Sequence, residues 1–301
     1  MKQPFTLEWR IPKEAEGQLL REFLKEHNIS KTALTDIKFN GGSIKVNNQE
    51  MNVRYRLNEQ DLLQVSFPPE VASDNVKPEA IPLHIVYEDG YLLVINKQAG
   101  MASIPSRQHL SGTLSNALLY YYQETGISST IHLVNRLDRD TSGLLIVAKH
   151  RYVHYLFSKA HETKMIRRTY RAIVHGCIQS VEGTIDAPIA RSEDSIITRT
   201  VADHGQRSIT HYSVVEQCSD YSYISIQLET GRTHQIRVHF SHLNHPLLGD
   251  DLYGGNREWI ARQALHSYEV TFYHPIFHKE LCFTAPLPHD MKAILERERT
   301  I

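Results

Sequence analysis

The spacing of apolar residues along the first part of the chain predicts a small module followed by a linker. Apolar positions recur at helical spacing at Leu19, Leu20, Phe23 and Leu24. After a Gly-Gly pair, residues 44–47 and 62–65 have the pattern of short strands. From Phe67 the chain continues as Pro-Pro-Glu and then through polar residues to Pro82, a composition typical of an exposed linker. We therefore predict an α+β module at residues 1–70 and a linker at 71–82.

Residues 83–301 have a longer series of predicted elements and form the second predicted domain. Strand-like segments on either side of Asp89-Gly90 favour a hairpin closed by a tight turn with left-handed backbone. The patterns predict helices at 114–122, 153–160 and 291–297, and further strands at 144–148, 165–174, 211–215 and 223–228. The whole pattern indicates a mixed α+β domain.

Composition limits the kinds of protein that the chain can be. With 301 residues and 41% hydrophobic content it can bury a full core. No apolar run approaches the roughly 18 to 20 residues that cross a bilayer, and the start lacks the apolar core of a signal peptide, so we expect a cytoplasmic protein without a membrane partner. The three cysteines are far apart in sequence and form no CxxC motif.

The net charge of -1 argues against a protein that holds nucleic acid by overall charge. Any basic surface must therefore be local. One stretch, residues 164–171, interleaves cations with apolar residues at strand-like spacing, so that one face could meet phosphate while the other packs inward. A basic run is more often a solvated face, and this stretch alone does not decide the matter.

Two clusters of polar residues are the candidates for chemistry. Residues 132–143, His-Leu-Val-Asn-Arg-Leu-Asp-Arg-Asp-Thr-Ser-Gly, lie between two apolar strand candidates, where catalytic loops are often placed. The plainer interpretation is that Asp138 or Asp140 bonds the backbone of its own turn. Residues 231–239 contain Arg232 and Arg237, whose guanidinium groups can hold a carboxylate or a phosphate. A structural ion pair is the equal alternative there, and only the two clusters together favour a functional site.

These two clusters carry a family resemblance. Residues 135–143 and 231–239 closely resemble the signature segments of the RluA-type pseudouridine synthases. Further similar segments follow in the family's order at 89–100, 168–172, 246–250, 253–254 and 262–266, and the first module resembles a diverged alpha-L type RNA-binding module. The resemblance implies a pseudouridine synthase fold, α+β with a large mixed and mostly antiparallel sheet, and an enzyme that isomerises uridine within RNA.

The resemblance also implies roles for individual residues. Asp138 matches the catalytic carboxylate, which either attacks the nucleotide or deprotonates the sugar in a route through a glycal. Arg237 matches the arginine that pairs with this carboxylate, and Tyr170 matches the tyrosine that stacks on the uracil and helps to move the proton from C5. Arg136 would face the same way as Asp138 in an extended loop and reach toward the RNA, with Leu137 pointing into the core.

Several expectations complete this hypothesis. The further candidate phosphate contacts are Arg139, Lys164, Arg167 and Arg168. The chain has Asn135 where the family usually has histidine, and asparagine can supply a loop hydrogen bond but cannot shuttle protons near neutral pH. Because the isomerisation needs a carboxylate, a shaped pocket and proton transfers, we expect no cofactor and no metal.

The partner and the competing hypotheses are set by weaker observations. The accessory module favours ribosomal RNA as the substrate, with transfer RNA as the alternative, and we expect a monomer. A non-catalytic RNA-binding protein is a second hypothesis, against which the Asp138, Tyr170 and Arg237 set argues. A metalloenzyme is a third and less favoured one, based on the crowded residues His234, His239, His242 and His245.

Overall fold

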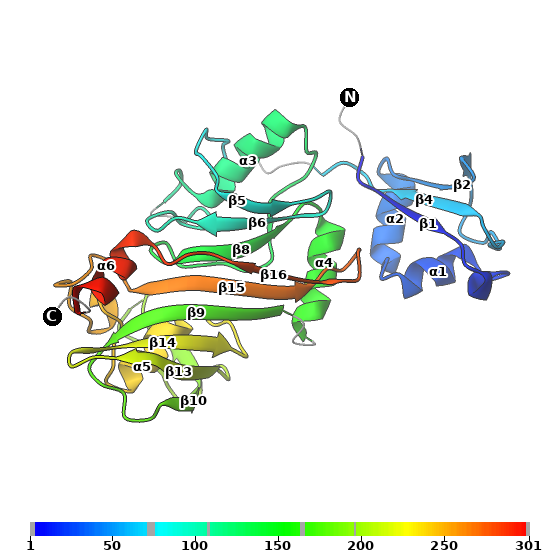
Figure 1. Ribbon diagram of the computed structural model, residues 1–301. Helices are drawn as coiled ribbons and strands as arrows, with labels where there is room; N and C mark the ends of the chain where they lie inside the picture. The colour runs from blue at the N-terminus through cyan, green and yellow to red at the C-terminus, as the bar shows by residue number, and fades with distance from the viewer. Residues whose placement is uncertain (1–3, 71–75, 107–108, 163–165, 196, 299–301) are drawn as a thin grey trace.

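The computed structural model has two main β-sheets, one near the N-terminus and a larger one formed by the rest of the chain (Figure 1). It describes residues 4–70, 76–106, 109–162, 166–195 and 197–298. The first sheet has the order β1-β4-β2-β3 and consists of β1 (Thr6–Arg10), β2 (Ser43–Val46), β3 (Gln49–Glu50) and β4 (Leu62–Ser66). It is accompanied by the short helix η1 (Lys13–Ala15), α1 (Leu20–Glu26) and α2 (Lys31–Phe39). The helix and the two strands predicted in this part of the chain are confirmed.

The second sheet has ten strands, with the central order β10-β13-β14-β9-β15-β8-β6-β5. Its strands are β5 (Ile85–Glu88), β6 (Leu92–Lys97), β7 (His132–Leu133), β8 (Ser142–Ala148), β9 (Ile166–His175), β10 (Glu182–Asp186), β13 (Ile209–Gln217), β14 (Tyr221–Leu228), β15 (Leu265–Tyr273) and β16 (Glu280–Thr284). Among the strand pairs of the described residues, only β8 with β15 is parallel in this sheet. A large mixed and mostly antiparallel sheet is therefore confirmed. A separate hairpin pairs β11 (Ile189–Arg191) with β12 (Arg199–Val201).

Helices cover both faces of the large sheet, which explains why all seven residues of β8 are buried. Leu144 packs in one apolar cluster with Phe157 of α4, whereas Leu145 packs in another with Leu118 of α3 and Phe240 of α5. The helices of this part are α3 (Leu114–Thr125), α4 (Arg151–Glu162), α5 (Gln235–His242), η2 (Asp251–Tyr253) and α6 (His289–Glu298). Leu137 of the candidate catalytic loop packs in the same cluster as α3 and α5.

The hairpin between β5 and β6 is confirmed, but its turn differs from the prediction. Neither Asp89 nor Gly90 has left-handed backbone. Instead, Asp89 Oδ1 accepts the N–H groups of Tyr91 at 2.7 Å and Leu92 at 2.9 Å. The prediction of a left-handed turn was wrong because the aspartate side chain satisfies the donors of the turn by itself.

The N-terminal module lies beside α4 (Figure 1), and aromatic side chains join it to the large sheet there. The ring of Phe5 stacks on His150 with centroids 4.1 Å apart, and Phe67 lies 5.4 Å from the ring of Tyr152. The Tyr152 hydroxyl donates to the carbonyl of His27 at 2.6 Å. These contacts merge the core of the module with the core beneath α4 into one apolar cluster.

Glu70 adds a buried carboxylate to this junction. Its side chain is 4% exposed and accepts hydrogen bonds from the Arg151 N–H at 2.8 Å and the Thr130 hydroxyl at 2.8 Å. It also lies 2.6 Å from His132 Nε2. Burial alone would raise the pKa of Glu70, but His132 and the hydrogen bonds outweigh burial and lower it well below its usual range. An ionised carboxylate therefore ties the end of the module to α4 and to β7.

Replacing Glu70 with glutamine is expected to lower the free energy of unfolding at neutral pH by about 2 kcal/mol, because an amide group then faces buried donors. The pKa of Glu70 is lower in the folded chain, so its stabilisation is complete above the unfolded pKa of about 4.3 and is lost as the pH falls toward the folded value. Thermal unfolding beside the exposed Glu59→Gln control tests this. Equal unfolding temperatures for the two variants would contradict it.

Candidate active site

The loop between β7 and β8 carries Asp138 and is fixed by side chains from other segments. Ser103 Oγ donates to the Leu137 carbonyl at 2.6 Å and accepts the Leu137 N–H at 3.2 Å. Asn135 is buried, and its Oδ1 accepts the Ile146 N–H of β8 at 2.9 Å. Asparagine therefore supplies the loop hydrogen bond that was expected of it.

Two basic side chains hold the backbone after Asp138. Lys97 is 1% exposed, its burial lowers its pKa to about 7, and its amino group donates to the Arg139 carbonyl at 3.0 Å. Arg262 donates to the Asp140 carbonyl at 3.0 Å and is itself held by the carboxylate of Asp290 at 2.7 and 2.9 Å. A loop tied at several successive peptides presents its carboxylate in one orientation, which a reacting group needs.

Arg237 brings the two sequence clusters together. It lies in the first turn of α5, and its Nη1 donates to Asp138 Oδ2 at 3.2 Å. Its Nε and Nη2 donate to the two oxygens of Asp250 at 2.7 and 2.8 Å. Burial alone would lower the pKa of Arg237, but the bonds and charge of Asp250, with Asp138 adding to them, raise it above its usual range. The guanidinium is thus a permanent cation, and its two hydrogen bonds to Asp250 fix its orientation.

His234 and Tyr253 complete the surroundings of the carboxylate. His234 has left-handed backbone, with φ of 58°, immediately before α5. Its Nδ1 lies 2.8 Å from the Tyr253 hydroxyl, and its Nε2 lies 3.8 Å from Asp138 Oδ2. The Tyr253 ring lies 4.9 Å from the Arg237 guanidinium carbon. Burial lowers the pKa of His234, and Asp138 opposes that shift.

A cleft of about 930 Å³ opens above these residues, and Asp138, Tyr170 and Arg237 all line it. Tyr170 is 4% exposed and comes from β9, whereas the side chain of Asp138 is 27% exposed. Seven arginines and three aspartates line this cleft, although the whole chain has a net charge of -1. The basic surface is therefore local, and it surrounds the candidate carboxylate.

The candidate RNA contacts divide into two groups. Arg136, Arg139 and Arg168 line the cleft, and Arg139 also pairs with Asp140 at 2.9 Å. Leu137 packs into the core as the alternation predicts. Arg167 lies outside the cleft and pairs with Glu280 at 3.1 Å near the far end of β15. Lys164 lies outside the described residues.

The histidines of the metalloenzyme hypothesis do not converge on one point. Both ring nitrogens of His239 are engaged, Nδ1 at 2.8 Å from the Thr210 hydroxyl and Nε2 at 2.9 Å from the Ala187 carbonyl. His245 Nδ1 lies 2.8 Å from the His175 carbonyl. Within the described ranges, no three histidine, cysteine, aspartate or glutamate side chains are grouped as metal ligands would be. The same ranges contain no helix that is long and apolar enough to span a membrane.

Comparisons with known proteins agree on one family. Residues 91–242 match the family described as RNA pseudouridylate synthase. The chain is 51% identical over 279 residues to the uncharacterized RNA pseudouridine synthase YjbO of Bacillus subtilis (strain 168), with 93% of this chain and 99% of that protein covered. It is 39% identical over 257 residues to the ribosomal large subunit pseudouridine synthase D of Zymomonas mobilis subsp. mobilis, with 80% of each covered.

The solved structure of human RNA pseudouridylate synthase domain containing 1 shares the fold, with a TM-score of 0.57 at 25% identity over 74% of this chain and 97% of that one. The chain therefore belongs to the RNA pseudouridine synthase family, and it is an isomerase of uridine in RNA. Ribosomal large subunit pseudouridine synthases of the D type are among its relatives. The resemblance, the fold class and the reaction expected from the sequence are confirmed.

Proposed function

We propose that Asp138 is the catalytic carboxylate of this pseudouridine synthase and that Arg237 keeps it ionised. The observation that carries the proposal is the 3.2 Å contact between the two side chains in the arginine-rich cleft. A carboxylate covered by a stacked base loses its water and is driven toward its neutral form unless a fixed cation opposes this. Asp250 holds that cation with two short hydrogen bonds, so the remaining Nη1 faces Asp138.

The reaction leaves the composition of the RNA unchanged. The bond from C1′ to N1 breaks, the uracil turns within the cleft, and a bond from C1′ to C5 forms. The hydrogen on C5 then leaves as a proton, and N1 gains one. Asp138 serves either as a nucleophile toward the nucleotide or as the base that takes a proton from the sugar and later returns it. Both routes require an ionised carboxylate and neither transfers electrons to a partner.

Tyr170 and Arg136 are proposed to hold the uridine in place. The target base must leave its stack, at a cost of a few kcal/mol that new contacts have to offset. Tyr170 lines the cleft with Asp138 and offers an aromatic face to the uracil, and its phenol can help to move the proton off C5 by passing its own proton on. Arg136 is exposed at the rim and fills the space that the extruded base leaves, while the exposed Arg139 meets a phosphate. Arg168 lines the same cleft but is only 8% exposed, so the part of it that can meet a phosphate is the part that faces the cleft.

Ribosomal RNA is the proposed substrate. Its support is the 39% identity to a relative named as a ribosomal large subunit enzyme, together with a separate N-terminal sheet that adds surface beside the catalytic part. We propose residues 1–70 as an RNA-binding module, 71–82 as the linker and 83–301 as the catalytic domain. The enzyme would act as a monomer in the cytoplasm, where its RNA is found.

Mapping pseudouridines in total RNA after deletion of the gene tests this substrate. The expected result is the loss of pseudouridine at one or a few positions of large-subunit ribosomal RNA, restored when purified enzyme is added to RNA from the deletion strain. Losses confined to transfer RNA would contradict the ribosomal assignment. An unchanged map in every RNA class would contradict the proposed cellular role.

A further inference from the structure

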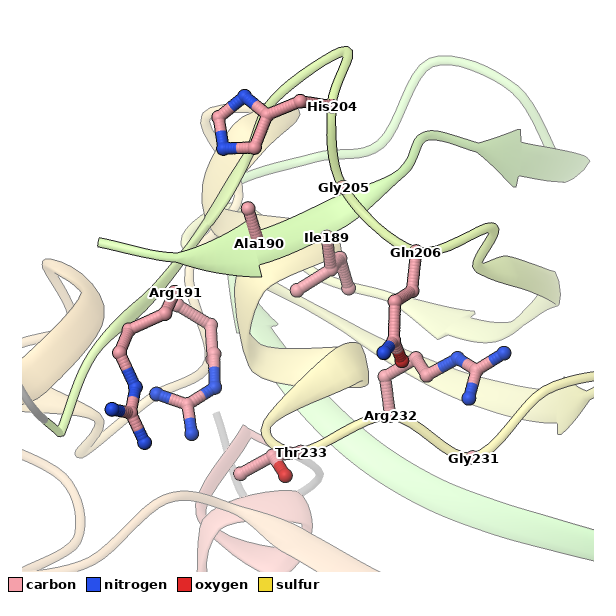
Figure 2. A pocket seen from close by; sticks show the side chains of 10 residues that line it. Ile189, Ala190, Arg191, His204, Gly205, Gln206, Gly231, Arg232 and Thr233 are labelled. Carbon is pink, nitrogen blue, oxygen red and sulfur yellow. The ribbon is translucent and has the colours of Figure 1, made fainter. Parts of the chain in front are cut away.

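A second pocket adjoins the catalytic cleft and has no role in the mechanism above. It has a volume of about 420 Å³ and lies between the hairpin of β11 and β12 and the segment before α5 (Figure 2). Gly231, Arg232 and Thr233 line both this pocket and the catalytic cleft. The pocket is therefore a side extension of the cleft, large enough for part of a nucleotide.

The pocket is strongly cationic. Arg191, Arg199 and Arg232 line it, and no aspartate or glutamate is among the described residues of its lining. Figure 2 shows Arg191 on one side of the pocket, and Gln206 and Arg232 on the other. In the described parts of the chain, the hydrogen bonds of these guanidinium groups go to backbone carbonyls, from Arg199 at 3.0 and 3.1 Å and from Arg232 at 3.3 Å. None of the three is paired with a carboxylate there.

Two of these arginines are placed where the fold alone disfavours them. Arg191 of β11 and Arg199 of β12 are direct partners across the hairpin. Like charges directly opposite each other destabilise an antiparallel pair. An anion that binds both groups would remove this repulsion, because a phosphate offers several acceptor oxygens to guanidinium groups. The opposed arginines thus lower the stability of the hairpin and favour the binding of an anion.

The hairpin is tied to the catalytic residues, which fixes the distance between the pocket and the carboxylate. The Arg199 N–H donates to the Tyr253 hydroxyl at 2.9 Å, and the same hydroxyl lies 2.8 Å from His234 Nδ1. The Tyr253 ring in turn contacts Arg237. A group bound in the pocket is therefore held at a constant position relative to Asp138.

We propose that this pocket binds a backbone phosphate of the RNA strand beside the target uridine. The inference rests on the proposed function, because it assumes that a uridine within a strand reaches Asp138. Phosphodiesters are the repeating anions of RNA, and arginine contacts to them set the position of the strand rather than its sequence. Arg191 and Arg199 of the hairpin would bind the phosphate on one side, and Arg232 would bind it on the side that the pocket shares with the cleft.

The test measures the affinity of a short single-stranded RNA with one uridine for the full chain at several salt concentrations. Arg191→Gln is expected to weaken binding about tenfold. It should also reduce the slope of log affinity against log salt by about 0.7, the value for one phosphate contact with a single strand. Lys279→Gln is the matched control, because Lys279 follows the end of β15 opposite to Gln263, which lines the cleft, and it should change neither quantity.

A second measurement separates binding from a structural role. Because Arg191→Gln removes a like-charge pair, its thermal unfolding temperature should equal or exceed that of the wild type. Neutral methylphosphonate placed at single linkages should weaken wild-type binding at one linkage next to the uridine, and should have much less effect on Arg191→Gln. A lower unfolding temperature, or equal sensitivity of both proteins at every linkage, would overturn the proposal.

Two further measurements separate binding of a free anion from binding of RNA, and failure of the pocket proposal from failure of the proposed function. Inorganic phosphate titrated alone should bind weakly, in the millimolar range, and tight binding would instead assign the pocket to a free anion. If the wild type forms pseudouridine and Arg191→Gln binds RNA like the wild type, the pocket proposal fails and the proposed function stands. If the wild type forms no pseudouridine in any RNA, the proposed function fails, whereas the affinities still report on the pocket.

Discussion

Asp138→Asn is expected to lower the rate of pseudouridine formation by more than about 10³-fold while the protein still folds and binds RNA. Asparagine has the same shape, and its amide oxygen can still accept from Arg237, whose Nη1 lies 3.2 Å from the present carboxylate. The amide is neither a nucleophile nor a base near neutral pH. The variant enzyme therefore lacks the reacting carboxylate but keeps the side chains that surround it.

Tritium release from RNA labelled at uracil C5 measures this loss. Asp140→Asn is the matched control, because Asp140 lines the same cleft and is two residues from Asp138 but pairs with Arg139 at 2.9 Å. We expect the control to retain activity within about tenfold of the wild type, since it removes one partly exposed ion pair. Robust release by Asp138→Asn, or an equal loss in both variants, would refute the assignment of the carboxylate.

Arg237→Met is expected to lower activity by more than about 10²-fold and the free energy of unfolding by about 3 to 5 kcal/mol. The substitution removes the cation beside Asp138 and leaves the carboxylate of Asp250, whose side chain is 1% exposed, without its partner. An uncompensated buried charge is the usual reason for so large a loss of stability.

The double variant Arg237→Met/Asp250→Leu separates the two effects of this change. Replacing both members of a buried ion pair with apolar residues often restores stability, so the double variant should unfold near the wild-type temperature. Its activity should stay as low as that of Arg237→Met, because the cation beside Asp138 is still missing. Recovery of activity together with stability would contradict a role of Arg237 in the reaction.

Local pattern was sufficient to predict most elements of the large sheet, and the family resemblance was sufficient to bring two distant clusters together. The helix at α4 and the strand β14 show clear periodicity in the sequence, and β8 is marked by a short apolar run with β-branched residues. The contact between Asp138 and Arg237 joins residues that are 99 positions apart, and no local pattern predicts such a pair. The resemblance supplied it because both segments match the family's motifs.

Other parts of the site depend on long-range packing and were not predicted. Asp250 is held against Arg237 by the chain's path after α5, and within the matched segment nothing sets it apart from other loop aspartates. Ser103 and Lys97 bind loop carbonyls, and hydrogen bonds to the backbone leave no pattern in the sequence. Gly143 has φ of 110°, and a Cβ there would lie 2.6 Å from Ser267 N of β15, a strand that was also not predicted.

The net charge of the chain did not predict the basic surface of the cleft, and the reason is physical. Acidic residues elsewhere balance the arginines of the cleft, so a net charge of -1 coexists with a strongly basic surface around Asp138. Arginines that are scattered in the sequence form a basic surface only when the fold places them side by side, as it does for Arg191 and Arg199 across one hairpin. RNA that approaches this protein responds to the local field of the cleft rather than to the total charge.

Single-turnover formation of pseudouridine, with enzyme in excess over ribosomal RNA from the deletion strain, tests the role of Asp138 most directly. Under these conditions slow product release cannot conceal the chemical step. The wild type should convert its target uridine completely, and Asp138→Asn, bound to the same RNA, should yield no pseudouridine on the same time scale. Conversion by Asp138→Asn at a rate near that of the wild type would contradict the account.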